Sequence, residues 1–389
     1  MKRVRVGVIY GGRSSEHEVS LASGAAVITH LKAERYEAIP ICIRKDGRWS
    51  LADRPPATLS AAEVITHARS LSESSTQTGR NRDVHFLAHP AESQVLTIQP
   101  AQRESGDDGV RAIVGTLGLD VVFPVVHGPY GEDGTLQGLL ELANVPYVGA
   151  GVLASAVAMD KAVAKTLFVA RGLPIVKHVV VQAMQWDAGG ATAMDDVEER
   201  LTYPLFVKPA NLGSSVGISK VTDRAQLERS IDVAREFDRK VIVEEAVPEV
   251  RELECGVLGN DVPEVSVPGE ILPAGDFYDY KSKYLDDRSS YVIPAKLNAK
   301  QTREIRTMAA EAFRAIEGTG MARVDFLFSR THRRLYLNEI NTIPGFTTIS
   351  MFAKLWEASG FDYPTLLERL IDLALERHSE KQRLKTSLS

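Results

Sequence analysis

With 389 residues, the chain is too long for a single hydrophobic core, so two or three domains are expected. Its 44% hydrophobic content and 25% charged content are typical of a soluble globular protein, and its net charge of −5 argues against nucleic acid or an anionic membrane surface as a partner. No segment has the apolar length of a membrane helix and the N-terminal apolar run is too short for a signal peptide, so we expect a cytoplasmic enzyme.

Two cysteines occur, each within an apolar run. Cys42 lies between two isoleucines, and Cys255 precedes Gly256 and Val257. Two widely spaced thiols provide neither a disulfide framework nor a zinc site, so both are expected to be core residues.

The N-terminal region alternates between strand and helix patterns. Residues 4–10 form an apolar run closed by two glycines, residues 19–31 have amphipathic helical spacing, and residues 38–44 are again apolar. A strand pattern returns at residues 119–126, followed by a helix with Leu136, Leu139, Leu140 and Ala143 on one face. This alternation predicts an α/β fold with an open, mostly parallel sheet.

Residues 53–108 interrupt this alternation. They are rich in serine, threonine and glutamine, with only weak periodicity near residues 84–98. We interpret them as a variable, partly flexible insertion in a first domain of residues 1–149, and assign them no function.

Two further domains are predicted, over residues 150–247 and 248–389. The first contains a helix at 160–171, stopped by Gly172, and strands at 204–209 and 240–244. The second contains a hairpin and two helices, and its charged tail from Glu376 is expected to fray. The inward residues predicted for these helices are Ile305, Met308, Ala309, Ala312 and Ile316, and then Leu366, Leu367, Leu370, Ile371 and Ala374.

The hairpin, residues 323–328 and 335–341, carries the most informative polar side chains. Since alternate residues of a strand share a face, Arg323 lies beside Asp325, and Glu339 beside Asn341. The oxygens of Asp325, Glu339 and Asn341 are suited to Mg²⁺ or Mn²⁺. The alternative is the solvated face of an edge hairpin.

A glycine-rich loop, residues 211–217, follows the strand that carries Lys208. Its glycines let backbone N–H groups approach phosphate oxygens, and Ser214 and Ser215 add hydroxyl donors. Lys161, at the start of a helix, indicates a negative partner because a lysine is locally unfavourable there. The alternatives are a mobile surface turn for the loop and a solvated surface lysine for Lys161.

Two more polar positions follow predicted strands. His127 joins a buried strand to a helix, where it could contact a transferring phosphoryl group or bond to backbone, with Glu132 and Asp133 as first-turn carboxylates. Glu16 could bind an ammonium group or cap the next helix.

The segment 276–284 contains three tyrosines and two lysines, a composition that packing does not require. It predicts a lid that excludes water from a reactive intermediate, with an exposed tyrosine-rich loop as the alternative. Together these features indicate a nucleotide-dependent phosphoryl-transfer site that lacks the Walker sequence.

These motifs, in this order and spacing, resemble the D-alanine–D-alanine ligases of the ATP-grasp superfamily. The resemblance spans almost the whole chain except residues 53–108 and the end of the tail, and implies three α/β domains with ATP gripped between the second and third. The motifs that carry it are Gly11-Gly-Arg-Ser-Ser-Glu16-His-Glu18, His127-Gly-Pro-Tyr-Gly-Glu132-Asp-Gly134, Met159-Asp-Lys161, Val207-Lys-Pro209, Gly213-Ser-Ser-Val-Gly217, Phe277-Tyr-Asp-Tyr-Lys-Ser-Lys-Tyr284, Arg323-Val-Asp325 and Asn338-Glu-Ile-Asn-Thr-Ile-Pro-Gly345.

The resemblance assigns roles to individual residues. ATP would be bound through its phosphates by Lys161, Lys208, the loop with Ser215, and the lid residue Lys283, and through adenine and ribose by Glu244, the backbone of Glu245 and Val247, and Glu252. Asp325, Glu339 and Asn341 would hold two Mg²⁺ or Mn²⁺ ions. The substrate and catalytic residues would be Glu16 on the first ammonium, Ser214 and Tyr284 beside it, His127 near the acyl phosphate, Arg323 and Gly345 on the oxyanion, and Ser350 with Met351 at the second carboxylate.

The implied activity is ATP-dependent synthesis of D-alanyl-D-alanine through an acyl phosphate, by a homodimer that supplies peptidoglycan precursors. A D-alanine–D-lactate ligase is the nearest alternative, which Tyr284 disfavours, and another ATP-grasp carboxylate–amine ligase is disfavoured by Glu16 and the lid motif. A nucleotide-binding regulator without catalysis is disfavoured by the intact hairpin motif. Glu245 stands where many relatives carry lysine, so only a backbone role is implied there.

Overall fold

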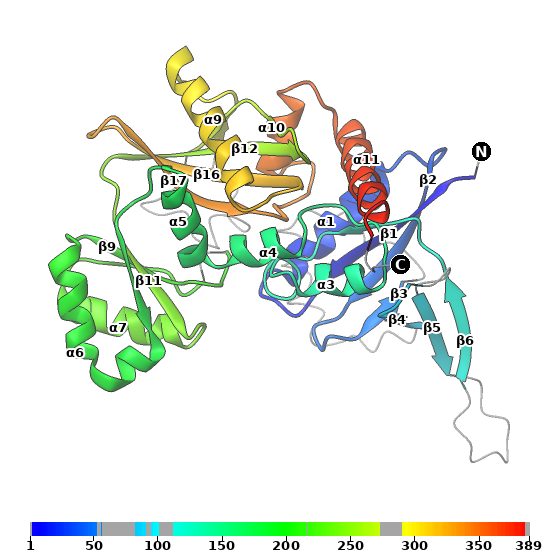
Figure 1. Cartoon of the computed structure of the whole chain (residues 1–389), viewed down its shortest axis with the longest axis horizontal. Helices are drawn as coiled ribbons and strands as arrows, with labels where there is room; N and C mark the ends of the chain where they lie inside the picture. The colour runs from blue at the N-terminus through cyan, green and yellow to red at the C-terminus, as the bar shows by residue number, and fades with distance from the viewer. Residues whose placement is uncertain are drawn as a thin grey trace.

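The structure is a computed structural model that describes residues 2–52, 56, 82–90, 95–100, 112–214, 216–272 and 290–385. Three β-sheets succeed one another along the chain, and helices cover each of them (Figure 1). None of the described helices is both long and apolar enough to cross a membrane.

The first sheet has a parallel centre. β1 pairs in parallel with β2 on one side and with β7 on the other, as predicted. Val6, Val8 and Tyr10 pack toward α1 and the last helix of the chain, whereas Ile9 packs toward α3. Since both faces are covered, β1 is apolar from Val6 to Gly11, and its charged residue Arg5 lies near the start of the strand. The elements are β1 Val4–Gly11, α1 His17–His30, β2 Tyr36–Ile43, β7 Val121–Pro124 and α3 Thr135–Leu142.

Helix α1 differs in character from the prediction. It is present, but it is buried on nearly all sides rather than amphipathic, because it lies between the first sheet and the last helix. Small residues such as Ala22, Ser23 and Ala25 allow this close approach.

Four antiparallel strands extend the first sheet beyond β2, which makes it mixed as a whole. Two of them fall within residues 53–108, so the described part of that segment contains regular strands, which the sequence analysis did not predict. The interpretation of the segment as a variable insertion stays a prediction. Val84 and Val95 are buried against Leu51, which gives these strands their place in the core. The strands are β3 Trp49–Leu51, β4 Arg82–Phe86, β5 Val95–Pro100 and β6 Ala112–Leu117.

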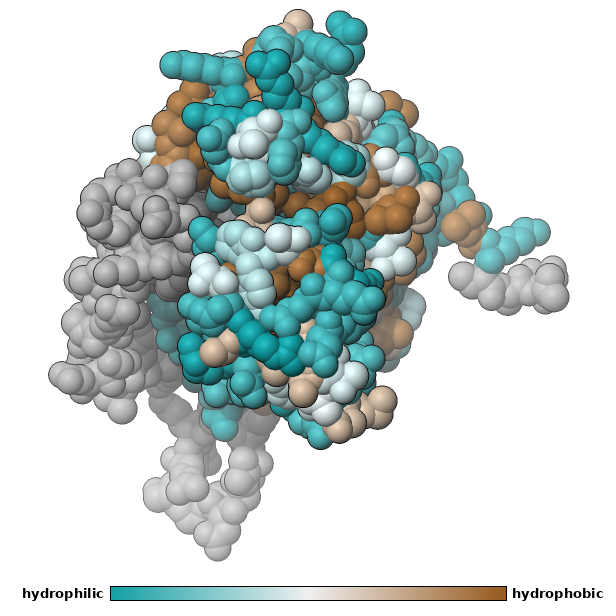
Figure 2. Space-filling view, turned by 90° about the vertical axis from the view of Figure 1, so that its left-hand side faces the viewer, coloured by the Kyte–Doolittle hydropathy of each residue, from teal (hydrophilic) through white to brown (hydrophobic). Residues whose placement is uncertain are grey.

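The second sheet is antiparallel, in the order β10-β9-β11-β8, and two helices cover one of its faces. Val181, Val207 and Val243 point into that core, where Trp186 and Leu227 meet them. The face of the molecule on which these helices lie is mainly hydrophilic, with hydrophobic residues in a band between its upper and lower parts (Figure 2). The elements are β8 His178–Gln182, α6 Ala183–Arg200, β9 Leu205–Pro209, β10 Ser219–Val221, α7 Arg224–Arg235 and β11 Lys240–Glu245.

The third sheet contains the predicted hairpin. It runs in the order β15-β14-β12-β16-β17, with β13 paired to β12. Cys255 is fully buried in its core, as predicted, and Cys42 is half-buried in β2. The elements are β12 Val250–Gly259, β13 Glu264–Val265, β14 Gly269–Leu272, β15 Ser290–Val292, α9 Ala299–Ala315, β16 Gly320–Ser329, β17 Arg334–Asn341 and α10 Met351–Glu357.

Helices α4 (Val152–Met159) and α5 (Lys161–Ala170) pack on the third sheet, although the chain next enters the second one. Ala154 and Phe168 join the same core as the predicted inward residues of α9. α5 therefore lies at the junction of the two sheets. The boundaries proposed at residues 150 and 248 stay predictions.

The last helix, α11 (Tyr363–Gln382), packs its predicted inward residues on the first sheet, beside α1 (Figure 1). The expectation that the tail from Glu376 frays is wrong, because α11 continues to Gln382. Arg377 donates to the carbonyl of Tyr147 at 2.8 Å, to the carbonyl of Gly149 at 2.5 Å and to Thr319 Oγ1 at 2.7 Å.

We predict that Arg377→Met lowers the free energy of unfolding by about 3 kcal/mol, because it leaves three partly buried acceptors without their donor. Urea denaturation followed by circular dichroism measures this. Arg383→Met is the matched control, since Arg383 is exposed and lies 4.0 Å from its nearest carboxylate partner, Glu380. Equal losses in both variants would contradict the assignment.

Candidate functional site

The hairpin brings its four polar residues together as predicted. Arg323 lies opposite Asn341 in the register of β16 and β17, and Asp325 lies opposite Glu339. The side chains of Arg323 and Asp325 are 19% and 13% exposed. β17 does lie at the edge of the sheet, but the face with Arg323 and Asp325 is largely buried, so the alternative of a solvated face is wrong.

Each carboxylate of this cluster meets a cation. Arg323 donates two hydrogen bonds to Asp325, both at 2.7 Å, and Asn341 Nδ2 donates to Asp325 Oδ2 at 3.0 Å. Glu339 Oε2 lies 3.4 Å from Lys161 Nζ. Glu254, which the sequence analysis did not single out, lies 3.0 Å from Arg323 Nε.

These contacts test whether the predicted metal ligands fit a cation. Asp325 and Glu339 already attract one guanidinium and one ammonium group, and both offer hard carboxylate oxygens. The side-chain carbonyl of Asn341 adds a neutral oxygen beside them. Such a set fits Mg²⁺ or Mn²⁺, and its small number of carboxylates suits a cation that also binds phosphate.

Lys161 opens α5, and its surroundings explain its position. Its Nζ donates to the carbonyl of Leu212 at 2.8 Å, and its side chain is 13% exposed. Asp160 caps the helix by accepting from Ala162 N and Val163 N, and it also pairs with Lys240. A solvated surface lysine is thereby excluded.

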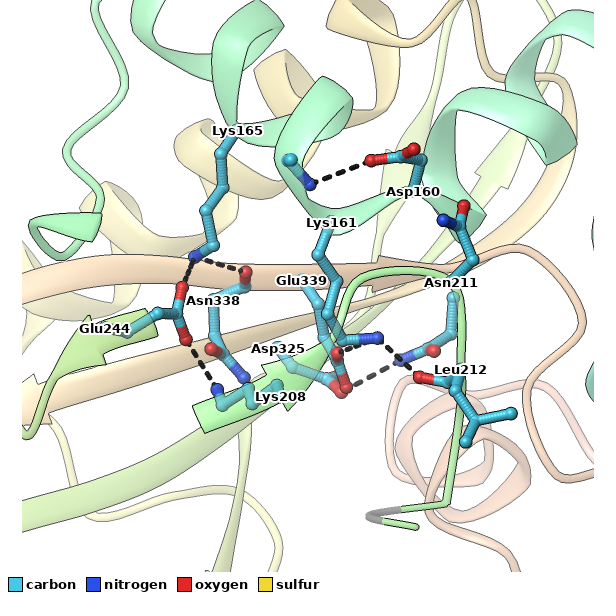
Figure 3. A network of polar contacts seen from close by, with 12 residues as sticks. Asp160, Lys161, Lys165, Lys208, Asn211, Leu212, Glu244, Asp325, Asn338 and Glu339 are labelled. Atoms are coloured by element: carbon cyan, nitrogen blue, oxygen red, sulfur yellow. Dashed lines mark hydrogen bonds and ion pairs between the residues drawn. The ribbon is translucent and has the colours of Figure 1, made fainter. Parts of the chain in front are cut away.

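A second cluster of charges lies beside the first (Figure 3). Glu244 Oε2 lies 2.6 Å from Lys208 Nζ, and Glu244 Oε1 lies 2.8 Å from Lys165 Nζ. Burial opposes ionisation of Glu244, but the two lysines outweigh it and hold its pKa well below the usual value. Burial likewise opposes the charge on Lys208, yet Glu244, Glu339 and Glu252 raise the pKa of this lysine.

The other predicted nucleotide-binding residues lie on β11, on β12 or in the turn between these strands. Glu245 donates its N–H to the carbonyl of Lys177 at 3.1 Å and accepts from Thr202 N through its side chain. The predicted backbone role of Glu245 would therefore fall to its carbonyl. Val247 and Glu252 are half-buried, and Glu252 acts electrostatically on Lys208.

Glu16 lies at the N-terminus of α1 but does not cap it. Instead its carboxylate forms a short hydrogen bond with the hydroxyl of Ser214, from the glycine-rich loop. A Cβ on Gly128 or Gly213 would come within 3.2 or 3.3 Å of Glu16 Oε2, so both glycines provide room for this carboxylate. The capping alternative for Glu16 is wrong, and the described part of the loop is tied at Leu212 and Ser214.

His127 is 2% exposed, and both of its ring nitrogens are engaged. Nδ1 lies 3.0 Å from the carbonyl of Ile343, and Nε2 lies 3.0 Å from Ser23 Oγ. Ser23 also accepts from Phe346 N at 3.3 Å. This favours the alternative of a histidine bonded to backbone, which holds the loop that contains Gly345.

Glu132 and Asp133, predicted as first-turn carboxylates, precede α3 and have different partners. Asp133 accepts from Tyr130 N and Thr135 N at the start of α3, whereas Glu132 lies 3.7 Å from His127. Burial opposes the charge on His127, but attraction by Glu132 and Glu16 outweighs burial and raises the pKa of His127. Burial raises the pKa of Glu132 in turn.

The segment after the hairpin contains the remaining predicted residues. Ser350 Oγ accepts from Thr347 N at 3.0 Å and would lie 3.3 Å from a Cβ on Gly345. Met351 is buried with Ile271 and Leu355, so only its backbone can meet a substrate. Ser215, Lys283, Tyr284 and the predicted lid lie outside the described residues.

All three parts of the molecule line one cavity. The first contributes Glu132, the second Lys161 and Gly213, and the third Glu339 and Asn341. The cavity thus brings the predicted cation ligands Glu339 and Asn341 together with Lys161, which the resemblance assigns to phosphate. Glu16 contacts the glycine-rich loop through Ser214. Such a site can transfer a phosphoryl group to a substrate that carries an ammonium group.

Lys165 and Glu254 are the two site residues that the sequence analysis missed. Lys165 follows Lys161 by four positions and so lies on the same side of α5, which was a usable signal. Glu254 lies on β12 opposite Asp325, a pairing that becomes visible only in the sheet.

Comparisons with known proteins agree with this geometry. The family models described as D-ala D-ala ligase N-terminus and C-terminus match residues 5–150 and 167–372. The D-alanine–D-alanine ligase of Heliobacterium modesticaldum is 47% identical over 98% of each chain. The structure of the ligase from Coxiella burnetii has a TM-score of 0.78 and 35% identity, and covers 98% of this chain and 97% of that one. A D-Ala:D-Ser ligase from Enterococcus faecalis has a TM-score of 0.76 and 34% identity over 96% of this chain and 100% of that one.

We predict that Glu132→Gln lowers the pKa of His127, because it removes the nearest charge that stabilises the imidazolium. Titration of the imidazole resonances by NMR measures this, and the resonance of the exposed His332 is the internal control.

The raised pKa of His127 also makes the stability of the fold depend on pH. Because the folded pKa of His127 lies above the unfolded value of about 6.5, its charged form stabilises the fold fully below that pH and ceases to do so as pH rises through the folded pKa. The difference in unfolding free energy between the wild type and Glu132→Gln should therefore narrow from pH 6 to pH 9. A constant difference would contradict the assignment.

Proposed function

The chain belongs to the D-alanine–D-alanine ligase family, and from that premise we propose that it uses ATP to join two D-alanines into D-alanyl-D-alanine, releasing ADP and phosphate. The product serves peptidoglycan precursor synthesis. The observation that supports the proposal is that Lys161, Glu339, Asn341 and Gly213 line one cavity. Gly213 in turn lies next to the carboxylate of Glu16.

The first half of the reaction activates a carboxylate. A carboxylate is a poor electrophile, so the γ-phosphoryl group of ATP is first transferred to one oxygen of the first D-alanine. Lys161 and Lys208 neutralise the phosphates, and Glu16 with Ser214 fixes the ammonium group. Two Mg²⁺ or Mn²⁺ ions, held by Asp325, Glu339 and Asn341, would supply further positive charge at the terminal phosphates.

The second half forms the peptide bond. The amine of the second D-alanine attacks the acyl carbon, the carbon–nitrogen bond forms, and the bond to the phosphate oxygen breaks. Arg323 and the Gly345 N–H stabilise the oxyanion, while Ser350 and the backbone of Met351 bind the second carboxylate. Asp325 and Glu254 hold the guanidinium of Arg323 in place.

The amine must also lose a proton, and Tyr284 is our candidate acceptor. A tyrosine with an ordinary pKa of about 10 needs local tuning for this task. The lid that contains Lys283 and Tyr284 would exclude water from the acyl phosphate, which is otherwise hydrolysed.

Other second substrates follow from the comparisons and from the chemistry. Similarity to a D-Ala:D-Ser ligase makes D-serine a competitor of D-alanine, and D-lactate would give an ester in place of an amide. We further propose a cytoplasmic homodimer, in keeping with the family likeness.

Incubation with ATP, Mg²⁺ and a panel of D- and L-amino and hydroxy acids tests the function, with product masses measured directly. Formation of D-alanyl-D-alanine as the main product is expected. A main product that contains D-serine or D-lactate would replace the proposed function by another member of the same class.

We predict that Glu339→Gln lowers kcat more than about 100-fold without loss of the fold, because it removes a carboxylate that binds the cations. Phosphate release and circular dichroism measure the two effects. Glu304→Gln, on the exposed side of α9, is the control with unchanged activity. Near-normal turnover of Glu339→Gln would remove the metal assignment.

We predict that Tyr284→Phe slows dipeptide formation or shifts the product toward the D-lactate ester, because the hydroxyl is the proposed proton acceptor. Competition between D-alanine and D-lactate across pH measures the partitioning of the two products. An unchanged rate and ratio at every pH would refute this role for Tyr284.

A further inference from the structure

Lys165 has no part in the mechanism above, yet it is one of the most deeply buried charged residues. It is 1% exposed, and its side chain extends from α5 toward β11 and β17 (Figure 3). Its Nζ lies 2.8 Å from Glu244 Oε1 and 3.1 Å from the carbonyl of Asn338. A buried ammonium group is costly unless it is paired and hydrogen-bonded, and Lys165 is both.

The partners of Lys165 belong to different sheets. Glu244 lies on β11 of the second sheet, and Asn338 lies on β17 of the third, directly before Glu339. α5 itself packs in the core of the third sheet through Ala164 and Phe168. Lys165 therefore joins the strand that carries Glu244 to the strand that carries the cation ligands.

Glu244 has two cationic partners, Lys165 and Lys208, for one negative charge. Glu244 is a single carboxylate between two lysines, one on each oxygen, and it is 2% exposed. If Lys208 turned from Glu244 to a phosphate, Glu244 would still keep Lys165. Without Lys165, the same movement would leave a buried carboxylate with no cation, which is strongly unfavourable.

We propose that Lys165 is a positioning residue for nucleotide binding: it keeps Glu244 paired, so that Lys208 can exchange Glu244 for the phosphates of ATP. Lys165 need not touch the nucleotide. Its lowered pKa, caused first by burial and then opposed by Glu244, agrees with a site in which Glu244 is its main support. The inference rests on the proposed function only for the identity of the nucleotide.

The test uses the full-length protein and an ATP analogue with an imido bridge between its β and γ phosphates, in the presence of Mg²⁺. Lys165→Met should weaken binding of the analogue, measured by calorimetry, and raise the KM for ATP, each at least tenfold. The KM for D-alanine should change less than threefold. Lys300→Met, an exposed lysine on α9, is the matched control with unchanged values.

A double variant separates this role from that of an ordinary ion pair. Glu244→Gln removes the carboxylate that would be left unpaired, and because Glu244 also has an assigned role at adenine, Glu244→Gln alone is the reference. Lys165→Met/Glu244→Gln should bind the analogue within threefold of that reference, whereas Lys165→Met should bind it at least tenfold more weakly than the wild type. If the ion pair of Lys165 and Glu244 had only a structural role, Lys165→Met would lower the melting temperature but leave the KM for ATP within twofold of the wild type. Either that result or a double variant that binds the analogue more than threefold more weakly than Glu244→Gln alone would overturn the proposal.

The double variant also covers the case in which Lys165→Met does not fold, because it contains no unpaired buried carboxylate. Binding of the analogue within threefold of Glu244→Gln alone would then support the proposal, and binding more than threefold weaker than Glu244→Gln would overturn it. Failure of the proposed function would appear differently, as a wild type that binds the analogue but forms no dipeptide.

Discussion

The structure depends on buried or half-buried carboxylates whose cationic or hydroxyl partners come from another part of the chain. Glu339 of the third sheet meets Lys161 of α5, Glu244 of the second sheet meets Lys165 of the same helix, and Glu16 of the first part meets Ser214 of the second. Loss of either partner would be most costly at Glu244 and Glu16, which are buried, and less so at Glu339, which is half-buried. The three parts are therefore held in the arrangement in which their charges are compensated. That arrangement is also the one in which the cavity has both phosphate-binding and cation-binding residues.

Much of this could be predicted from the sequence where the pattern is local. The hairpin was predictable because its alternation of polar and apolar residues fixes which side chains share a face, and Arg323, Asp325, Glu339 and Asn341 are indeed neighbours. The helices α5, α9 and α11 were predictable from their apolar faces and end signals. The pairing of Glu16 with Ser214 was different in kind. It joins residues far apart in sequence, and only the family resemblance pointed to it.

The failures have physical causes. β4 and β5 were missed because only Val84, Val95 and a few neighbours of these short strands face the core, which gives a weak pattern. Helix α6 was missed because its backbone leaves helical geometry at Gly189, within a region of low apolar periodicity. Lys165 could not be told from a surface lysine until the helix had a known environment. The helical end of α11 is stabilised by Tyr147 and Thr319, which no local pattern connects with Arg377.

The packing of α11 on the first sheet affects how the chain can fold during its synthesis. Leu366, Leu370 and Ile371 complete the same core as Val6 and Phe123, so one side of β1 and β7 is covered by a helix that is translated much later than these strands. The nascent chain must keep that apolar surface exposed until α11 has left the ribosome. The N-terminal part should consequently be a client of chaperones during synthesis, and premature termination before α11 should yield an aggregating product rather than a shortened enzyme.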